Sequence, residues 1–434
     1  MRRVFTWIGW SMLLAGCMQQ QKQEQETTFI DVENEDMITI NREKYKDQLQ
    51  GFWLGQCIAN WTGLITEMDK IGGEGIDGIG AGFYTRADWG QPDQPNIWNS
   101  NLVSDTIDFY FVDQDGIWGA DDDTDIEYMY QYLLYQHNTS LLTASEIREG
   151  WLTHIYSDEN TPFRNENGEP ENYLWVSNQR AHDLMKAGLL PPATGDSVNN
   201  PHYEMIDAQL TTEIFGLYAP GRCDIALQLA RLPIQTTARG NAECIAQFYV
   251  SMYALASVDM PGMDRKARLT QMAERSKFTL PEGSYALDMY EFVKAKYLAR
   301  VSWEEARDAL HERYQVQQTA GYSWATRDEA CNGCFAAGIN FGASLISLFY
   351  GEGDLKETIK IGVLAGWDSD NPTATWGGLL GFMLGKSGVE ETFGRKFSNR
   401  FNIHRTRGGF PHDGINTFEH MAEVGTKIVD RALN

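Results

Sequence analysis

Apolar side chains recur every three or four positions along most of this chain from residue 42 onward. Between residues 45 and 60, Leu49, Phe52, Trp53 and Cys57 fall on one face of a helix. The same spacing predicts further helices over 126–135, from 145, and over 174–189, 203–217, 223–232, 242–256, 284–299, 303–314, 334–350, 355–365, 373–384 and 418–432. Strand signals are sparse, and there is no strand–helix alternation or phosphate-binding loop. The pattern therefore predicts an all-α fold.

One long segment, residues 72–119, interrupts the helical pattern. It is rich in Gly, Asp, Trp and Asn and shows little periodicity, and long loops of this kind are often functional. Aromatic residues among polar ones are typical of carbohydrate clefts, while packing of a long loop explains them equally well. The residues concerned are Tyr84, Arg86, Trp89, Trp98 and Trp118.

The N-terminus has the organisation of an export signal. Arg2 and Arg3 precede an apolar run over residues 4–14, which is too short to span a bilayer. The Leu-Ala-Gly-Cys sequence that ends at Cys17 resembles the lipobox of bacterial lipoproteins, which implies cleavage before Cys17 and lipidation of that residue. Met18 in place of Asp implies an outer-membrane destination. The alternative is an ordinary signal peptide with an incidental cysteine.

These features predict three regions. Residues 1–16 form a lipoprotein signal peptide, residues 17–41 form a Gln- and Glu-rich flexible linker, and residues 42–434 form a single helical domain. No second apolar segment is long enough to cross a membrane. We therefore expect membrane contact only through the lipid anchor, and the sequence does not indicate an oligomeric state.

Charge and cysteine content narrow the candidate partners. The chain has 60 acidic and 36 basic side chains, a net charge of -24. An acidic surface repels phosphate backbones, so we expect no nucleic-acid partner. Cys331 and Cys334 have the spacing of a metal or redox pair, but a structural zinc site needs a second pair that the chain lacks. A local disulfide or two buried thiols is the expectation.

Two aspartate clusters stand where predicted helices begin. Asp121, Asp122 and Asp123 precede the helix expected from residue 126, and a second cluster runs from Asp368 to Asn371. Adjacent carboxylates repel one another unless they are solvated, cap a helix or bind a cation. A helix N-terminus stabilises one or two of them. Two such loops would also suit a hard cation such as Mg²⁺, although composition alone favours solvated caps.

Four motifs, in order, carry a family resemblance. Residues 51–67 look like a first helix that ends in Gly-Asp-x-x-Gly-x-x-x-Glu, and residues 121–124 match a Thr-Asp-Asp-Thr metal motif. Residues 200–221 are similar to a segment that reads Asn-Pro, Ile-x-Ala-Gln and Pro-Gly. Residues 365–370 resemble Gly-Gly-Asp-Thr-Asp, followed by the expected glycines over 377–381. Together they resemble the ADP-ribosylglycohydrolase family.

The resemblance covers about residues 42–434 and implies an all-α fold with a dinuclear Mg²⁺ or Mn²⁺ site, where a ribosyl anomeric carbon is hydrolysed. It implies Glu67 or Asp123 as the catalytic carboxylate that takes a proton from the attacking water. The metal ligands carried over by position, with two flanking residues of the same motifs, are Asp121, Asp122, Asp123, Asp368, Asp370 and Asn371.

The chain departs from the family pattern near these motifs. Asn60 replaces an Asp, and Asp121 and Asn371 replace hydroxyl residues. Trp367 replaces a Gly, where it either stacks on a sugar or fills the core. The general acid is not assigned. By residue type the candidates are His154, His182, His202 and His404, and a structural role is commoner for each.

The resemblance implies a metal-dependent hydrolase that cleaves an N- or O-glycosidic bond, and the export signal predicts that it acts outside the cytoplasm. We expect a sugar, oligosaccharide or nucleoside-type glycoside as its substrate rather than ADP-ribosyl-protein. The alternatives are a catalytically inactive glycan-binding surface lipoprotein and a structural lipoprotein whose aspartates are only helix caps.

Overall fold

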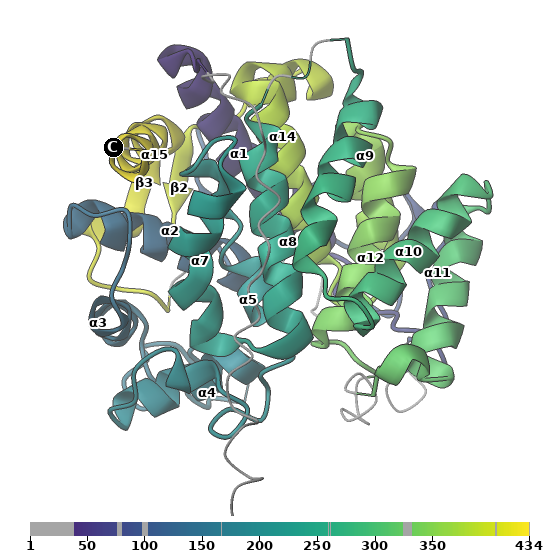
Figure 1. Ribbon diagram of the computed structural model, residues 1–434, viewed down its shortest axis with the longest axis horizontal. Helices are drawn as coiled ribbons and strands as arrows, with labels where there is room; N and C mark the ends of the chain where they lie inside the picture. Colours follow the sequence, from purple (N-terminus) through teal and green to yellow (C-terminus); the bar gives the residue numbers. More distant parts are fainter. Residues whose placement is uncertain are drawn as a thin grey trace, which may run out of the picture. The chain divides into compact units, whose positions relative to one another are not determined.

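Helices dominate the computed structural model, which describes residues 39–433 apart from 76–79, 98–102, 166, 259, 261, 324–331 and 404–405. Residues 38–434 form one compact unit, so the predicted signal, Cys17 and most of the linker lie outside the described residues. The helices are α1 (Arg42–Gly63), α2 (Asp122–Gln136), α3 (Ala144–His154), α4 (Val176–Lys186), α5 (Asp207–Leu210), α6 (Ile214–Leu217), α7 (Cys223–Thr237), α8 (Gly240–Ala256), α9 (Arg265–Ser276), α10 (Tyr285–Leu298), α11 (Trp303–His311), α12 (Ala337–Tyr350), α13 (Leu355–Ala365), α14 (Asp370–Phe393) and α15 (Phe418–Ala432) (Figure 1).

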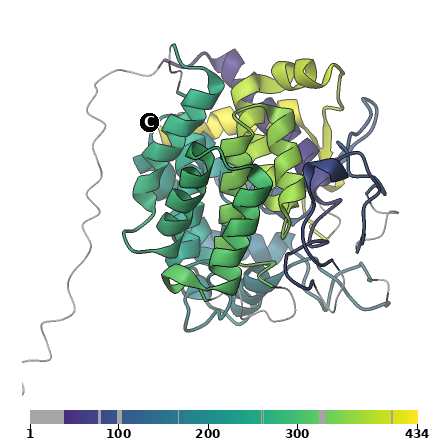
Figure 2. The ribbon, with the colours of Figure 1, turned by 90° about the vertical axis from the view of Figure 1, so that its right-hand side faces the viewer.

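The strands are few and short. β1 (Trp118–Gly119) pairs in parallel with β2 (Arg400–Asn402), and β2 pairs antiparallel with β3 (Ile415–Thr417). The segment 72–119 has no other regular element among its described residues except one short 3₁₀ turn, and it runs along one side of the helices (Figure 2). The predicted all-α fold with one irregular excursion is therefore confirmed.

Several helix boundaries follow the sequence pattern closely. α13 and α15 begin and end at the predicted residues, and Ser302 and Glu305 form the capping box that opens α11. The prediction of one helix over 203–217 is wrong, because the chain there forms α5 and α6 with a break between them. α9 was missed because its buried apolar stripe is narrow.

Glycines allow α1 and α14 to pack with their backbones in contact. A Cβ atom on Gly55 would lie 2.3 Å from the carbonyl oxygen of Gly377, and one on Gly377 would lie 2.2 Å from Cβ of Ala59. Gly51 and Gly381 face each other in the same way. This close approach brings the end of α1 to the beginning of α14, where the two helices contribute residues to the candidate site.

A pair of buried carboxyl groups lies in the core between α2 and α6. Glu127 accepts hydrogen bonds from Gln56 Nε2 at 2.6 Å and from the backbone N–H of Ile214 at 2.8 Å. Glu213 accepts one from the hydroxyl of Thr375 at 2.8 Å. Burial raises the pKa of Glu213 to about 7, and it also raises the pKa of Glu127 well above the usual value, with the charge of Glu213 adding to the effect.

We expect Glu213→Gln to flatten the dependence of stability on pH. The folded state keeps the Glu213 proton up to about pH 7, whereas the unfolded chain loses it near pH 4.3. The parent therefore loses stability as pH rises through this window. A glutamine stays neutral, and the Thr375 hydroxyl can accept its N–H. Urea denaturation at pH 5 and pH 8 should show a gain for the variant at pH 8 only.

The exposed Glu282→Gln is the control, and it should follow the parent at both pH values. An equal stability change for Glu213→Gln at pH 5 and pH 8 would show that Glu213 does not hold a proton in the folded state.

Candidate active site

Two loops that are distant in sequence meet where α1 ends and α14 begins. The hydroxyl of Thr66 donates to the carbonyl of Val363 at 2.6 Å, and the hydroxyl of Ser369 donates to the carbonyl of Gly63 at 3.0 Å. The backbone N–H of Met68 donates to the carbonyl of Trp367 at 2.7 Å. These bonds hold the turn that follows α1 against the loop that precedes α14.

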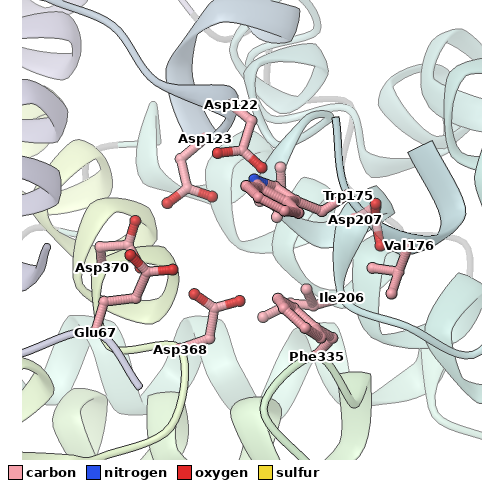
Figure 3. Close-up of a pocket in the computed structure, with 11 residues that line it drawn as sticks. Glu67, Asp122, Asp123, Trp175, Val176, Ile206, Asp207, Phe335, Asp368 and Asp370 are labelled. Atoms are coloured by element: carbon pink, nitrogen blue, oxygen red, sulfur yellow. The ribbon is translucent and has the colours of Figure 1, made fainter. Parts of the chain in front are cut away.

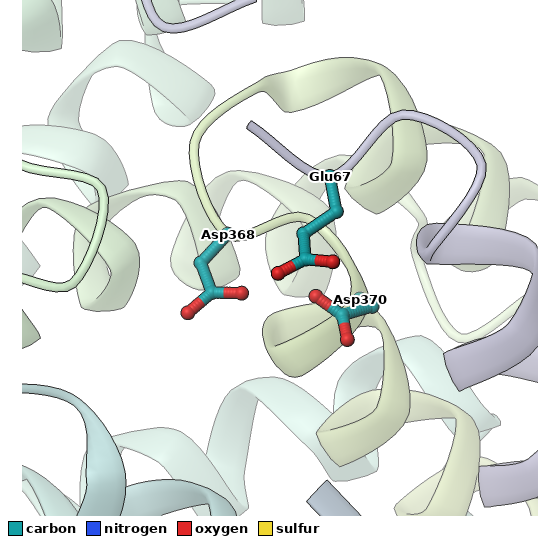
Figure 4. A group of neighbouring side chains, drawn as sticks. All are labelled: Glu67, Asp368 and Asp370. Carbon is teal, nitrogen blue, oxygen red and sulfur yellow. The ribbon is translucent and has the colours of Figure 1, made fainter. Parts of the chain in front are cut away.

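This junction gathers three carboxylates. Glu67 lies on the turn after α1, and Asp368 and Asp370 lie on the loop and at the first position of α14, with their oxygens pointing toward one another (Figure 4). A Cβ atom on Gly63 would lie 2.3 Å from Cα of Asp370. Only a glycine at position 63 therefore permits the two helix ends to come this close.

The N-terminus of α2 completes the cluster. Asp121 is the N-cap of α2 and accepts a hydrogen bond from the backbone N–H of Asp123 at 3.1 Å. Asn60 Nδ2 donates to Asp123 Oδ2 at 3.0 Å and to Asp370 Oδ2 at 3.4 Å. An amide at position 60, where the family pattern has an acid, thus links the two aspartate clusters without adding another negative charge.

The oxygens fall into two groups that share one residue. Glu67, Asp368 and Asp370 have ligand oxygens within 4.8 Å of one another, and so do Asp121, Asp123 and Asp370. The buried Oδ2 of Asp121 and Oδ1 of Asp370 have no hydrogen-bond partner. A donor set made only of oxygens suits Mg²⁺ or Mn²⁺. The residues therefore fit the divalent metal that the family resemblance implies, and Asp370 would be shared by two positions.

Burial and mutual repulsion dominate the electrostatics of this cluster. Burial raises the pKa of Glu67, Asp121 and Asp123 well above the usual values, and the neighbouring charge of Asp370 adds to the rise in each case. Burial has the same effect on Asp368. Carboxylates this close remain ionised together only when a cation compensates them, which is consistent with a metal site.

A buried ion pair lies next to the carboxylate cluster, at the start of α2. Arg407 Nε lies 3.0 Å from Asp125 Oδ2, and both side chains are almost fully buried. Burial raises the pKa of Asp122, and the Arg407 charge partly opposes this rise. Arg407 Nη1 and Nη2 also donate to the carbonyls of Asn172 and Tyr173 at 2.9 and 3.2 Å. Arg407 thus ties the start of α2 to the loop that leads to α4.

The carboxylates open into a pocket that also has an apolar side (Figure 3). Asp207 Oδ1 accepts a hydrogen bond from the backbone N–H of Asn178 at 2.8 Å, so this carboxylate caps the N-terminus of α4 from another helix. The lining residues are Glu67, Asp122, Asp123, Trp175, Val176, Ile206, Asp207, Leu210, Phe335, Asp368 and Asp370.

The sequence patterns had not singled out Asp207, Trp175 or Phe335 for this site. Asp207 lies inside the 200–221 segment that carried part of the family resemblance, so a signal was present, but the periodicity predicts a single helix over 203–217 and gives this acid no special place. Trp175 and Phe335 were read only as members or neighbours of predicted helices. Their proximity to the carboxylates depends on the tertiary fold.

The other predicted site residues are placed as follows. Asn371 contacts the cluster through its amide nitrogen, since its Nδ2 donates to Asp123 Oδ1 at 3.3 Å and its Oδ1 accepts from Gln209 Nε2 at 3.4 Å. For Asn371 to ligate a metal through its side-chain carbonyl oxygen, the side-chain amide would have to rotate by about 180°. Among the described histidines, His154, His182 and His202 do not line the pocket, and His154 Nδ1 bonds the carbonyl of Gly408 at 2.9 Å. His404 lies outside the described residues.

Trp367 fills the core and does not face a sugar. Its exposed fraction is 0%, and its ring packs against Phe83 and His311 at centroid distances of 4.8 and 6.2 Å. Its φ of 59° is the left-handed conformation that glycine adopts most readily. The family pattern has glycine at this position, and here the buried contacts of the indole offset the strain of the backbone.

The described aromatic residues of segment 72–119 do not line the pocket either. Tyr84 and Trp118 are buried, and their polar atoms bond Asp93 Oδ1 at 2.5 Å and the carbonyl of Ser398 at 3.2 Å. Trp89 is half-buried against Phe109. Arg86 pairs with Glu304 at 2.5 Å, and Trp98 lies outside the described residues. Of the two alternatives for these residues, the contacts of Tyr84, Trp89 and Trp118 agree with packing of the loop against its surroundings.

The described cysteines show no metal site. Cys334 is disulfide-bonded, and Cys57, Cys223 and Cys244 are free thiols. Cys331 lies outside the described residues. A disulfide at Cys334 agrees with the first of the two expectations for this pair.

The chain matches one family model and is similar to a solved structure. The solved structures include a similar chain, described as an ADP-ribosylglycohydrolase-related protein complex, with 16% identity over 90% of this chain and 99% of that chain and a TM-score of 0.46. No curated protein matches. The model of the ADP-ribosylglycohydrolase family matches residues 41–413. The resemblance drawn from the motifs is confirmed, and this chain belongs to the ADP-ribosylglycohydrolase family.

Proposed function

We propose that this protein is a divalent-metal-dependent hydrolase of N- or O-glycosidic bonds. The observation that carries the proposal is the sharing of Asp370 between two groups of three carboxylates at the edge of a pocket. Two hard cations so held would suit a sugar substrate, because each can take hydroxyl oxygens in place of waters. Family membership supports the reaction class, and the substrate is part of the proposal.

The proposed chemistry divides between the cation and the chain. Glycosidic cleavage passes through an oxocarbenium-like state. Glu67, Asp368 and Asp370, with Asp121 and Asp123, would hold the divalent ion, which would supply a Lewis acid that orients sugar hydroxyls and lowers the pKa of a water. Glu67 is only partly buried and lines the pocket, so its carboxylate takes the proton of the attacking water, with Asp123 as the second candidate for this role. Asn60 positions Asp123 and Asp370 through its hydrogen bonds.

We further propose that the protein acts outside the cytoplasm as a lipoprotein anchored through Cys17, on the outer membrane. The signal and lipobox pattern of residues 2–17 supports this. None of the helices in the described part of the chain has the length and apolarity that a membrane span requires. An exported enzyme meets sugars, oligosaccharides and nucleoside-type glycosides, which we propose as its substrates. Labelling with radioactive palmitate tests the lipid anchor. The parent should incorporate the label, and Cys17→Ser should not.

A screen of aryl glycosides with Mg²⁺ or Mn²⁺ tests the activity. We expect turnover that a chelator abolishes and that added Mg²⁺ restores. A glycan that binds stoichiometrically and is never hydrolysed would instead identify a binding protein. Calorimetry gives an independent check, because no heat at millimolar Mg²⁺ or Mn²⁺ would leave the aspartates as helix caps and overturn the metal site.

A further inference from the structure

One buried amide side chain reaches the carboxylate cluster from α12, a helix that contributes no carboxylate to it. Asn340 lies near the beginning of α12 and is fully buried. Its Oδ1 accepts a hydrogen bond from the backbone N–H of Asp368 at 3.2 Å. Asn340 does not line the pocket, so this bond to Asp368 is its connection to the candidate site.

The peptide group between Trp367 and Asp368 is held at both ends. Its carbonyl oxygen accepts the backbone N–H of Met68 at 2.7 Å, and its N–H donates to Asn340. Trp367 has a left-handed φ of 59°, which is uncommon for a residue other than glycine and persists only where surrounding contacts hold it. The two bonds therefore fix the backbone of Asp368 relative to the turn that carries Glu67.

Two further carbonyl groups determine which end of the Asn340 amide faces Asp368. Nδ2 donates to the carbonyls of Cys334 and Ala336 at 2.7 and 3.1 Å. A carbonyl oxygen can only accept, so these bonds place the amide nitrogen on that side and leave Oδ1 for the N–H of Asp368. Cys334 is itself restrained, because it is disulfide-bonded. The amide therefore joins Asp368 to the disulfide-bonded segment in a single orientation.

The stability of α12 alone does not account for an asparagine at this position. Asparagine has a lower helix propensity than alanine or leucine, and burial of an amide costs free energy unless its polar atoms are hydrogen-bonded. Both polar atoms of Asn340 are hydrogen-bonded, and their partners are Asp368 and two residues that precede α12. The side chain thus stabilises the Asp368 loop and the segment before α12 rather than the helix that carries it.

The two carboxylate groups differ in their dependence on Asp368. One group consists of Glu67, Asp368 and Asp370, and the other consists of Asp121, Asp123 and Asp370. A displacement of Asp368 would therefore alter one of the two candidate metal positions and leave the other intact. Removal of a residue that orients a metal ligand typically lowers metal affinity by about 10–100-fold.

We propose that Asn340 is a positioning residue for one of the two metal positions, the one that Asp368 would complete with Glu67 and Asp370. It acts by holding the backbone of Asp368 and contacts neither metal nor substrate. This role rests on the metal site of the proposed function and adds that the two positions are supported separately. It does not depend on which glycosidic bond is cleaved.

Titration of the full chain with Mn²⁺ alone tests this role without a substrate. The electron paramagnetic resonance signal of free Mn²⁺ gives the number of bound ions and their affinities. We expect the parent to bind two ions, one for each carboxylate group. Asn340→Ala should bind one ion with the parental affinity and the second at least about tenfold more weakly. Circular dichroism checks that each variant is folded.

Two further variants separate positioning from a general loss of stability. Ser347→Ala is the matched control, because Ser347 is also fully buried in α12 and donates to a backbone carbonyl, that of Thr358, at 2.8 Å. It should leave both Mn²⁺ affinities at the parental values. Asn340→Asp should also retain both ions. A buried carboxyl group keeps its proton, so it can donate to Cys334 while its other oxygen accepts from Asp368.

Parental affinity for both ions in Asn340→Ala would overturn the inference. Equal weakening of both ions would overturn it as well, because that result is expected of a residue that only stabilises the fold. If Asn340→Ala does not fold, loss of an ion in Asn340→Asp overturns the inference and retention of both ions supports it.

Failure of the proposed function gives different results. A parent that binds fewer than two ions would overturn the shared metal site, and the role of Asn340 with it. If the parent binds two ions and Asn340→Ala loses one, but no glycoside is hydrolysed, the role of Asn340 stands and the proposed reaction fails.

Discussion

Asp370→Asn is expected to abolish divalent-metal binding and to lower kcat/KM for any glycoside substrate by at least about 100-fold. Asp370 is the one residue common to both carboxylate groups, so its loss disrupts both candidate metal positions at once. The folded state should survive. Removing a charge from a crowded, buried cluster relieves repulsion, and Asn can still accept the hydrogen bond from Asn60. Without metal, we expect Tm to equal or exceed that of the parent.

Thermal melts with and without Mg²⁺ give a readout that does not need a known substrate. The parent should gain stability on addition of Mg²⁺, because a ligand that binds only the folded state raises Tm. Asp370→Asn should show no gain, whereas the exposed Asp115→Asn should behave like the parent. A parental Mg²⁺ response in Asp370→Asn would refute the bridging role of Asp370.

Gly377→Ala is expected to lower the free energy of unfolding by about 2 kcal/mol or more. The added Cβ would lie 2.2 Å from Cβ of Ala59 and 2.7 Å from the carbonyl oxygen of Gly55, so α1 and α14 must move apart. Overpacking of this kind typically lowers the free energy of unfolding by about 1–3 kcal/mol, and the higher helix propensity of alanine offsets only part of this loss. Urea denaturation followed by circular dichroism measures the loss.

The same helix offers a matched control for this substitution. Gly388 also lies in α14, but the nearest atom to its added Cβ is the Leu384 side chain at 3.1 Å rather than a facing backbone. Gly388→Ala should be neutral or stabilising by up to about 1 kcal/mol. Because Asn60 and Asp370 lie where α1 and α14 meet, Gly377→Ala should also weaken Mg²⁺ binding. Equal stability of the two variants would show that the glycine contact does not constrain the helices.

Much of the fold could be predicted because helical periodicity is local. A buried stripe recurs every three or four residues, which is why α13 and α15 match their predictions from end to end. The prediction failed where a boundary depends on contacts made elsewhere. Buried Leu229, Ala230 and Ile234 accompany the continuation of α7 past Pro233, and no local signal indicates that continuation.

The carboxylates of the candidate site could be named from motif order, but their arrangement could not. Glu67, the two aspartate clusters and their spacing are readable in the chain, and the structure brings five of these acids into two groups around Asp370. Asn371 was named from its place in the motif, and the four histidines were named by residue type alone. Residue type does not specify which way an amide points or which side chains reach a pocket.

The sequence by itself determined the helical fold, the family and the identity of most of the acidic cluster, because periodicity and motif order are properties of the chain. Only the tertiary structure decided that Asp370 is shared, that Trp367 is core, and that Trp175, Asp207 and Phe335 complete the pocket. The physical reason is that these features depend on how closely helices distant in sequence approach one another. Glycines at 55, 63 and 377 let backbones touch, and residues some 300 positions apart in sequence then share one site.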